Sequence, residues 1–222
     1  MIALLGDIHG NVTSLKIAIN HAVAAGASSI FQLGDFELFL DQEQEANEIA
    51  SVVKDSPIPV YFEDGNHDDC SRWTQLTDIT EVLPNLFYVP RGTVFELDGR
   101  TIAVMGGAAS IDKEMRLRMK RQWDPKENIT PEEQDRLLKN AEGRVIDLFL
   151  THCPPSAIIE LYFNPLWKLR FGVSADWTDP NEHIIEDLWH KLGTPHIYSG
   201  HMHRRIVGPN YRILDIDELV MV

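Results

Sequence analysis

Short apolar runs that end in polar clusters recur along the chain, and they predict buried strands followed by turns. Each run is rich in Ile, Leu, Val or Phe, and the cluster behind it contains Asp, Asn or His, mostly next to glycine. The runs with this form are Ile2–Leu5, Ile30–Leu33, Val60–Phe62, Val145–Leu150 and Ile197–Ser199.

Amphipathic stretches between some of these runs predict helices. Residues 12–25 place apolar side chains on one helical face, with Asn11 as the N-cap and Gly26 at the C-terminal end. Thr130-Pro131-Glu132-Glu133 predicts a capping box that begins a helix ending near Asn140, and Asp179-Pro180-Asn181-Glu182 predicts a similar start for a helix ending near Leu192.

The middle and the end of the chain favour hairpins. Phe87–Val89, Val94–Leu97 and Thr101–Met105 indicate a meander, and Asp98-Gly99 is typical of a tight two-residue turn. The tail predicts further strand at Tyr211–Leu214 and Leu219–Met221. Alternating strands and helices followed by hairpins indicate an α/β fold with mixed sheets and helices on the outside.

Composition narrows the class of protein. The chain has 222 residues, 44% of them hydrophobic, so we expect one globular domain spanning residues 1–222. Its formal net charge of −14 argues against a general nucleic-acid binder and against anionic membrane surfaces. Two cysteines exclude a disulfide framework, and neither a signal peptide nor a spanning helix is expected. We therefore predict a cytoplasmic protein.

The polar clusters follow predicted strands, and functional groups in open α/β sheets gather at the carboxyl ends of strands. One shared site is therefore expected from a set of histidines, carboxylates and one amide: Asp7, His9, Asp35, Asn66, His67, His152, His201 and His203. Asp7 and His9 are two residues apart, as are His201 and His203. On extended backbone such pairs point the same way, so each pair could place two ligands on one metal.

Imidazole, carboxylate and amide donors suit Mn, Fe, Zn or Ni. Two such ions bridged by one carboxylate would form the clamp used in phosphoester hydrolysis, where they acidify a bridging water and hold the phosphoryl oxygens. An unligated histidine could then protonate the leaving oxygen as a general acid.

The motifs resemble those of the calcineurin-like metallophosphoesterases. The matching blocks occur in the family's order: Gly6-Asp7-Ile8-His9, Gly34-Asp35, Gly65-Asn66-His67-Asp68, Thr151-His152 and Gly200-His201-Met202-His203. The resemblance implies a four-layer αββα sandwich of two mixed sheets. It implies two divalent ions, with manganese expected first. The first ion would be held by Asp7, His9 and His203. The second would be held by Asn66, His152 and His201. Asp35 would bridge both ions and take part in catalysis, and His67 would contact the phosphate and act as the general acid.

The chain departs from the Ser/Thr protein phosphatase branch directly after Gly34-Asp35. The Asp and Arg of that branch are replaced by Leu38 and Phe39, which argues against membership of the branch. The histidine His67 therefore needs another orienting partner, and Glu37, Asp68 and Asp69 are the candidates. A further segment from Gly106 to Pro125 is similar to small bacterial and phage-encoded members.

The expected activity is hydrolysis of a phosphodiester in a small molecule such as a nucleotide. A phosphomonoesterase is the alternative, and a non-catalytic scaffold with this fold is a third interpretation. Net acidity disfavours nucleic acid as a partner, no membrane is expected, and the oligomeric state is left open. The residues expected to bind substrate are Asn66, His67, Arg116, Arg118 and Arg204.

Residues 113–126 hold six of the twenty basic residues and have two interpretations. The segment could be a solvated helix face, or Arg116, Arg118 or Arg121 could reach the mouth of the site and bind phosphate. Aromatic residues such as Trp123 and Trp167 could line a pocket or belong to the core. The thiol of Cys153 is interpreted as a small buried group rather than a nucleophile.

Overall fold

Two six-stranded mixed sheets form the centre of the computed structural model, which describes residues 1–119 and 123–222. The first sheet has the order β12 (Leu219–Met221), β1 (Ile2–Leu5), β2 (Ser29–Leu33), β3 (Val60–Glu63), β5 (Leu86–Tyr88) and β4 (Thr80–Leu83). The second has the order β10 (Ile206–Val207), β11 (Tyr211–Ile213), β9 (His196–Ser199), β8 (Leu148–Thr151), β7 (Arg100–Met105) and β6 (Thr93–Leu97). In both sheets the four inner strands are parallel and the edge strands are antiparallel to their neighbours.

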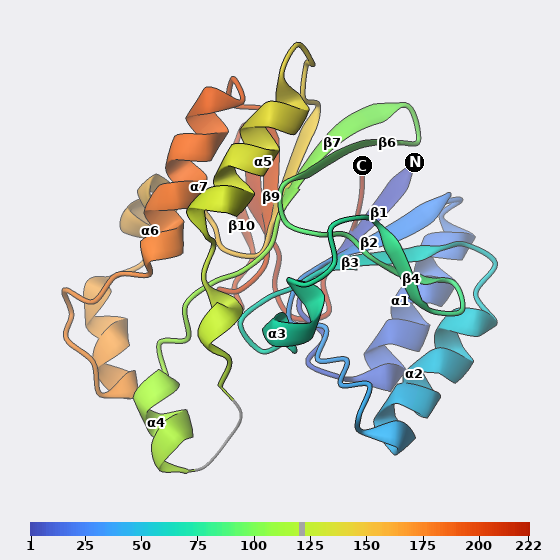
Figure 1. Cartoon of the computed structure of the whole chain (residues 1–222), viewed down its shortest axis with the longest axis horizontal. Helices are drawn as coiled ribbons and strands as arrows, with labels where there is room; N and C mark the ends of the chain where they lie inside the picture. Colours follow the sequence, from blue (N-terminus) through green and yellow to red (C-terminus); the bar gives the residue numbers. More distant parts are fainter. Residues whose placement is uncertain (120–122) are drawn as a thin grey trace.

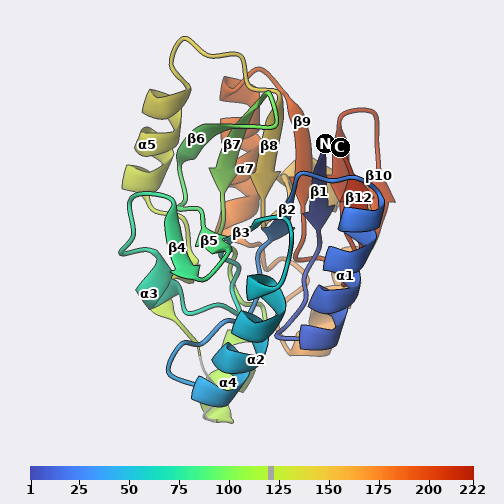
Figure 2. The same cartoon turned by 90° about the vertical axis from the view of Figure 1, so that its right-hand side faces the viewer.

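Helices cover the outer faces of both sheets (Figures 1 and 2). The first sheet carries α1 (Val12–Ala24) and α2 (Glu43–Lys54). The second carries α5 (Pro131–Ala141), α6 (Ser156–Tyr162) and α7 (Pro180–Lys191). Shorter elements lie in the connections: α3 (Cys70–Trp73), α4 (Lys113–Arg118) and the 3-10 helices η1 (Pro125–Glu127) and η2 (Pro165–Phe171). The predicted four-layer αββα sandwich is confirmed.

The strands alternate between two cores because successive side chains of a strand point to opposite faces of its sheet. In β1, Ile2 and Leu4 pack between the sheets, whereas Ala3 and Leu5 face α1 and α2. Strand β8 behaves in the same way, since Leu148 and Leu150 join the inner core and Phe149 packs under α5 and α7. Strands buried on both faces form continuous apolar runs, which is why they were visible in the sequence.

The predicted helix boundaries agree closely with the structure. Asn11 accepts a hydrogen bond from Ser14 N, and the capping box of Thr130 and Glu133 is formed in both directions. Asp179 caps α7 through Asn181 N. The hairpin between β6 and β7 turns on Asp98 and Gly99, which both have the positive φ angles that a two-residue turn of this type requires.

The strand predicted from Val145 begins only at Leu148. Val145 is 84% exposed, and it lies in the connection before the sheet. Helix α2 was not predicted, because Gln42 at its N-cap makes no side-chain capping hydrogen bond and no capping motif marks its start. Within the described residues, no helix is long and apolar enough to cross a membrane.

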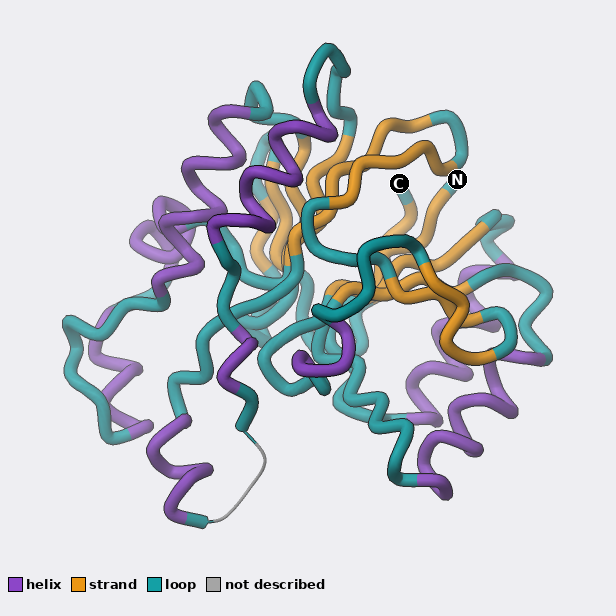
Figure 3. The backbone as a smooth tube through the Cα atoms, viewed as in Figure 1, coloured by secondary structure: helices purple, strands orange, loops and turns teal. Residues whose placement is uncertain are grey.

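The carboxyl ends of the parallel strands in the two sheets meet at one edge of the sandwich. Figure 3 shows this edge near the middle of the view, where loops from both halves come together. These loops contain the motif residues that follow β1, β2, β3, β8 and β9.

Candidate metal centre

Several motif residues sit in tight loops with left-handed backbone. The φ angles are 45° at His9, 55° at Asp35, 67° at His201 and 47° at His203, a region that residues other than glycine rarely adopt. Strained backbone of this kind clusters at functional sites, where the surrounding structure holds it in place. The loops turn sharply, so the expectation that residues two apart point the same way fails for His201 and His203, which join different groups.

The first donor group contains Asp7, His9, Asp35 and His203, each with one donor atom within 4.8 Å of the others. His203 Nε2 lies 3.1 Å from Asp7 Oδ2 and 3.0 Å from His9 Nε2. His9 Nε2 is 4.0 Å from Asp35 Oδ2. Asp7 is 1% exposed, and it also accepts hydrogen bonds from the backbone N–H of His201, which ties the loops after β1 and β9 together.

The second donor group contains Asp35, His152 and His201, with Asn66 beside them. His152 Nδ1 lies 2.7 Å from the carbonyl oxygen of Leu33. The ring donates its Nδ1 proton there. Nε2 is 3.3 Å from Asp35 Oδ1 and 3.3 Å from Asn66 Oδ1. Two oxygen donors therefore converge on this nitrogen, and a metal cation would fit there in place of the second ring proton. Asp35 belongs to both groups.

The electrostatics favour positive charge at the centre of both groups. Burial opposes a charge on His152, yet the Asp35 carboxylate raises its pKa to about 10. Burial opposes a charge on His9 too, but the hydrogen bond with Glu37 and the nearby Asp35 and Asp7 carboxylates raise its pKa to about 9. Burial and the neighbouring His152 lower the pKa of His201 to about 3, so its lone pair is free. Divalent ions would supply the positive charge that the carboxylates attract.

Close approach of the donor atoms explains the glycines in the motifs. A Cβ at Gly65 would overlap Asp35 Oδ1 and lie 2.6 Å from His152 Nε2. A Cβ at Gly200 would overlap Asp7 Oδ1 and lie 3.0 Å from the Leu33 carbonyl oxygen. Any side chain at these two positions would push the donors apart.

The comparison with protein families agrees with this geometry. The family model described as calcineurin-like phosphoesterase matches residues 1–205. The chain belongs to the calcineurin-like phosphoesterase family. It is therefore a metal-dependent phosphoesterase by family, and the family resemblance inferred from the motifs is confirmed.

A solved structure shares the fold at low sequence identity. The crystal structure of TT1561 from Thermus thermophilus is similar with a TM-score of 0.57 and 15% identity, covering 96% of this chain and 88% of that one. An amidase from Nesterenkonia sp. aligns over 78% of this chain and 72% of its own, with 14% identity and a TM-score of 0.33. No curated protein matches the chain.

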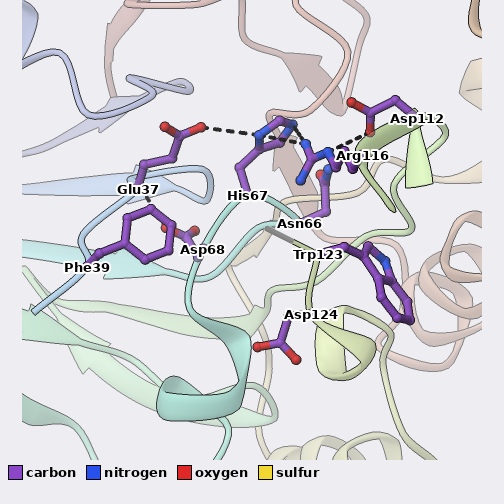
Figure 4. Close-up of a pocket in the computed structure, with 9 residues that line it drawn as sticks. All are labelled: Glu37, Phe39, Asn66, His67, Asp68, Asp112, Arg116, Trp123 and Asp124. Atoms are coloured by element: carbon purple, nitrogen blue, oxygen red, sulfur yellow. Dashed lines mark hydrogen bonds and ion pairs between the residues drawn. The ribbon is translucent and has the colours of Figure 1, made fainter. Parts of the chain in front are cut away.

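In this phosphoesterase, His67 belongs to neither of these two donor groups but forms a third one with His9 and Glu37. Figure 4 shows its ring between Glu37 and Arg116. Its Nδ1 is 3.2 Å from Glu37 Oε1. The Arg116 guanidinium contacts both ring nitrogens, with Nη2 2.7 Å from Nδ1 and also against Nε2. Glu37 also lies 2.9 Å from His9 Nδ1. Burial raises the pKa of Glu37, but its hydrogen bonds with His67 and His9 outweigh this and hold the pKa at about 2.

The two other candidate partners of His67 have different roles. The Asp68 carboxylate accepts hydrogen bonds from the backbone N–H of Gly65 at 2.7 Å and of Glu37 at 2.6 Å, so it fastens the loops after β2 and β3 to each other. Asp69 caps α3 and pairs with Arg72. Glu37 is thus the carboxylate of the three that the structure places against His67.

The basic residues expected to bind substrate differ in placement. Arg116 is 6% exposed and lines a pocket of about 210 Å³ with His67, Trp123 and Phe39. Arg118, two positions further along α4, is exposed and does not line this pocket, because residues two apart on a helix face different directions. Arg121 lies outside the described residues. Arg204 is exposed and donates a hydrogen bond to the carbonyl oxygen of Tyr162.

A second pocket, of about 320 Å³, opens directly onto the donor groups. It reaches Asp35, Asn66, His201 and His203 on one side. Its other wall is aromatic and carries one further arginine: Phe163, Trp167, Phe171 and Arg170. Sequence reasoning named Trp167 only as an aromatic that could line a pocket, and it missed Arg170. The segment η2 has no recognisable motif, so only the fold could bring it to the site.

Proposed function

We propose that this protein hydrolyses a phosphodiester with two divalent ions, manganese first, and with His67 as the general acid. The observation that supports it best is the position of Asp35, which is shared by two donor groups and also accepts a hydrogen bond from His67 N at 2.8 Å. Asp7, His9 and His203 would hold one ion. Asn66, His152 and His201 would hold the other.

The ions, when bound, would supply Lewis-acid stabilisation of the phosphoryl oxygens and lower the pKa of the attacking water. The protein's own residues would supply a proton to the leaving oxygen, which lies on the side of phosphorus opposite the attacking water. The ionised Glu37 carboxylate would accept a hydrogen bond from His67 Nδ1–H and so stabilise the doubly protonated ring. That ring would give its Nε2 proton to the leaving oxygen and return to the neutral form, once substrate takes the place of the Arg116 guanidinium at Nε2. Arg116 beside the ring carries a charge that would attract a phosphoryl oxygen.

The substrate we propose is a small phosphoester with a flat organic group, such as a nucleotide. The support is the second pocket, whose aromatic wall of Phe163, Trp167 and Phe171 adjoins the donor groups. Its volume of about 320 Å³ is of the size that small-molecule ligands occupy. Arg170 at the rim could pair with a further phosphate or stack on a base.

A panel of phosphoesters tests the proposal. With Mn²⁺ we expect faster turnover of bis-p-nitrophenyl phosphate than of p-nitrophenyl phosphate, and of cyclic nucleotides or dinucleotides than of single-stranded DNA and RNA. Bound metal is quantified in the same samples. Faster turnover of monoesters would favour the monoesterase, and no turnover of any ester with ions bound would favour a non-catalytic scaffold.

The variant His67→Ala tests the general acid. Removal of such a group costs about 10²–10⁴-fold in rate, and the loss should grow with the basicity of the leaving group. We expect a small loss on nitrophenyl esters and a large one on alkyl or ribosyl esters, with the metal content unchanged. The control His183→Ala changes an exposed histidine of α7 and should leave both rates unaltered. Equal losses on both ester types would contradict the assignment.

A further inference from the structure

Three buried side chains, those of Asn66, Ser110 and Glu127, form a hydrogen-bonded network. The Asn66 Nδ2 amide donates a hydrogen bond to Ser110 Oγ at 3.2 Å. The Ser110 hydroxyl in turn donates to Glu127 Oε2 at 2.6 Å, and Ser110 N donates to Glu127 Oε1 at 3.0 Å. Asn66, Ser110 and Glu127 are 5%, 4% and 2% exposed, so water cannot replace these partners.

The backbone segments that contain Ser110 and Glu127 are each held in place by further hydrogen bonds. Gly107 N donates to the Asp64 carbonyl oxygen at 2.7 Å, and Ala109 N donates to Asp179 Oδ2 at 2.8 Å, which fixes the segment before Ser110. The buried Arg91 donates to the backbone carbonyl oxygen of Glu127 at 3.1 Å. Because these segments are fixed, the three side chains cannot move apart when a substitution leaves two hydrogen-bond donors facing each other.

The direction of the hydrogen bonds follows from the carboxylate at the end. An ionised carboxylate only accepts, so Ser110 must donate its single hydroxyl proton to Glu127. The serine oxygen can then only accept from Asn66, which must present its NH₂ group to Ser110. The amide oxygen of Asn66 is left facing His152 Nε2, at a distance of 3.3 Å.

We infer that Ser110 and Glu127 are positioning residues that fix the amide of Asn66 with its oxygen toward the second ion. This inference rests on the proposed function only for the metal at Asn66, His152 and His201. It assigns a role to Ser110 and Glu127, which lie outside the motif blocks that contain the proposed metal ligands. Outer partners of metal ligands typically contribute about 10–100-fold to metal affinity.

The variant Glu127→Gln tests the inference through metal binding alone. The amide of the new glutamine can be oriented in two ways. With its oxygen accepting from Ser110 N, its NH₂ group donates to the serine oxygen, and the serine hydroxyl proton then points toward the NH₂ group of Asn66. With the amide flipped, its NH₂ group faces the N–H of Ser110, and neither group can accept. We expect the second ion to bind about 10–100-fold more weakly and the first to be unaffected. Burial raises the pKa of Glu127, so the Mn²⁺ titration is carried out above neutral pH, and it would show this as one tight site in place of two.

Matched variants separate positioning from folding. Glu132→Gln removes the same charge from an exposed position and should keep both sites. Ser110→Ala should reproduce the loss, and Ser110→Thr, which keeps the hydroxyl, should restore binding. Asn66→Ala sets the size of the effect, and adding Glu127→Gln to it should cause no further loss, since both changes act through one ligand.

Two results would overturn the inference. One is wild-type affinity at both sites in Glu127→Gln, and the other is an equal loss at both sites, which would point to a general effect on the fold. Thermal unfolding of each variant is measured alongside. Because the readout is metal affinity, a chain that binds two ions but hydrolyses no phosphoester would refute the proposed function without touching this inference.

Discussion

Replacing Asp35 with asparagine should nearly abolish hydrolysis and weaken the binding of both metal ions at once. Asp35 is the residue common to the two donor groups, and it is 1% exposed. The nearby His152, His67 and His9 overcome the effect of burial and hold its pKa well below the usual range, so the group is a full negative charge at neutral pH. Metal ions contribute several kcal/mol to such reactions, and we expect a rate loss of about 10³-fold or more.

Metal content after dialysis and turnover in excess Mn²⁺ measure the two effects separately. Asp7→Asn is the informative comparison. Because Asp7 belongs to the first donor group alone, this substitution should weaken the binding of one ion rather than two. Asp41→Asn, an exposed aspartate in the loop before α2, is the charge-matched control and should behave as the wild type. Retention of two ions by Asp35→Asn would refute the bridging role.

The largest loss of stability is expected for Arg91→Met. Arg91 is 1% exposed, and its guanidinium lies 2.5 Å from Asp64 Oδ2 and 3.3 Å from Glu133 Oε2. It also donates to the carbonyl oxygens of Lys126, Glu127 and Asn128. Removing one partner of a buried ion pair costs about 3–5 kcal/mol, because the other charge is left buried and uncompensated. For a chain of this size, that corresponds to a fall in the unfolding temperature of about 10 °C.

Chemical and thermal unfolding check this expectation. Arg72→Met is the control, since Arg72 forms a half-exposed pair with Asp69 and such pairs contribute about 0–1 kcal/mol. Adding Asp64→Asn to Arg91→Met should recover part of the loss by removing the stranded charge. A cost below about 1 kcal/mol for Arg91→Met would show that the pair is not what holds the β5–β6 connection to the segment at Lys126–Asn128.

Much of the fold could be predicted because local rules and burial agree along this chain. Strands such as β1 and β2 are buried on both faces, so they appear as unbroken apolar runs. Capping residues marked the starts of α1, α5 and α7, and the turn at Asp98-Gly99 marked a hairpin. Helix α2 was not predicted because no capping residue marks its start, and η2 was not predicted because 3-10 segments have no clear periodicity.

The sequence by itself determined the family and which side chains meet at the edge of the sandwich. Parallel strands of one sheet must end on the same side, so polar residues after β1, β2 and β3 had to gather there. Their identity as carboxylates, imidazoles and an amide already selected the chemistry.

Only the tertiary structure decided how those groups are supported. The family resemblance implied that His201 and His203 belong to different ions, and the structure shows that sharp left-handed loops send them to different donor groups. The contacts of Glu37 with His67 and of Glu127 with Ser110, and the choice of Arg116 over Arg118, join loops and helices far apart in the chain. Such pairings depend on how whole layers pack together, and no local pattern in the sequence encodes them.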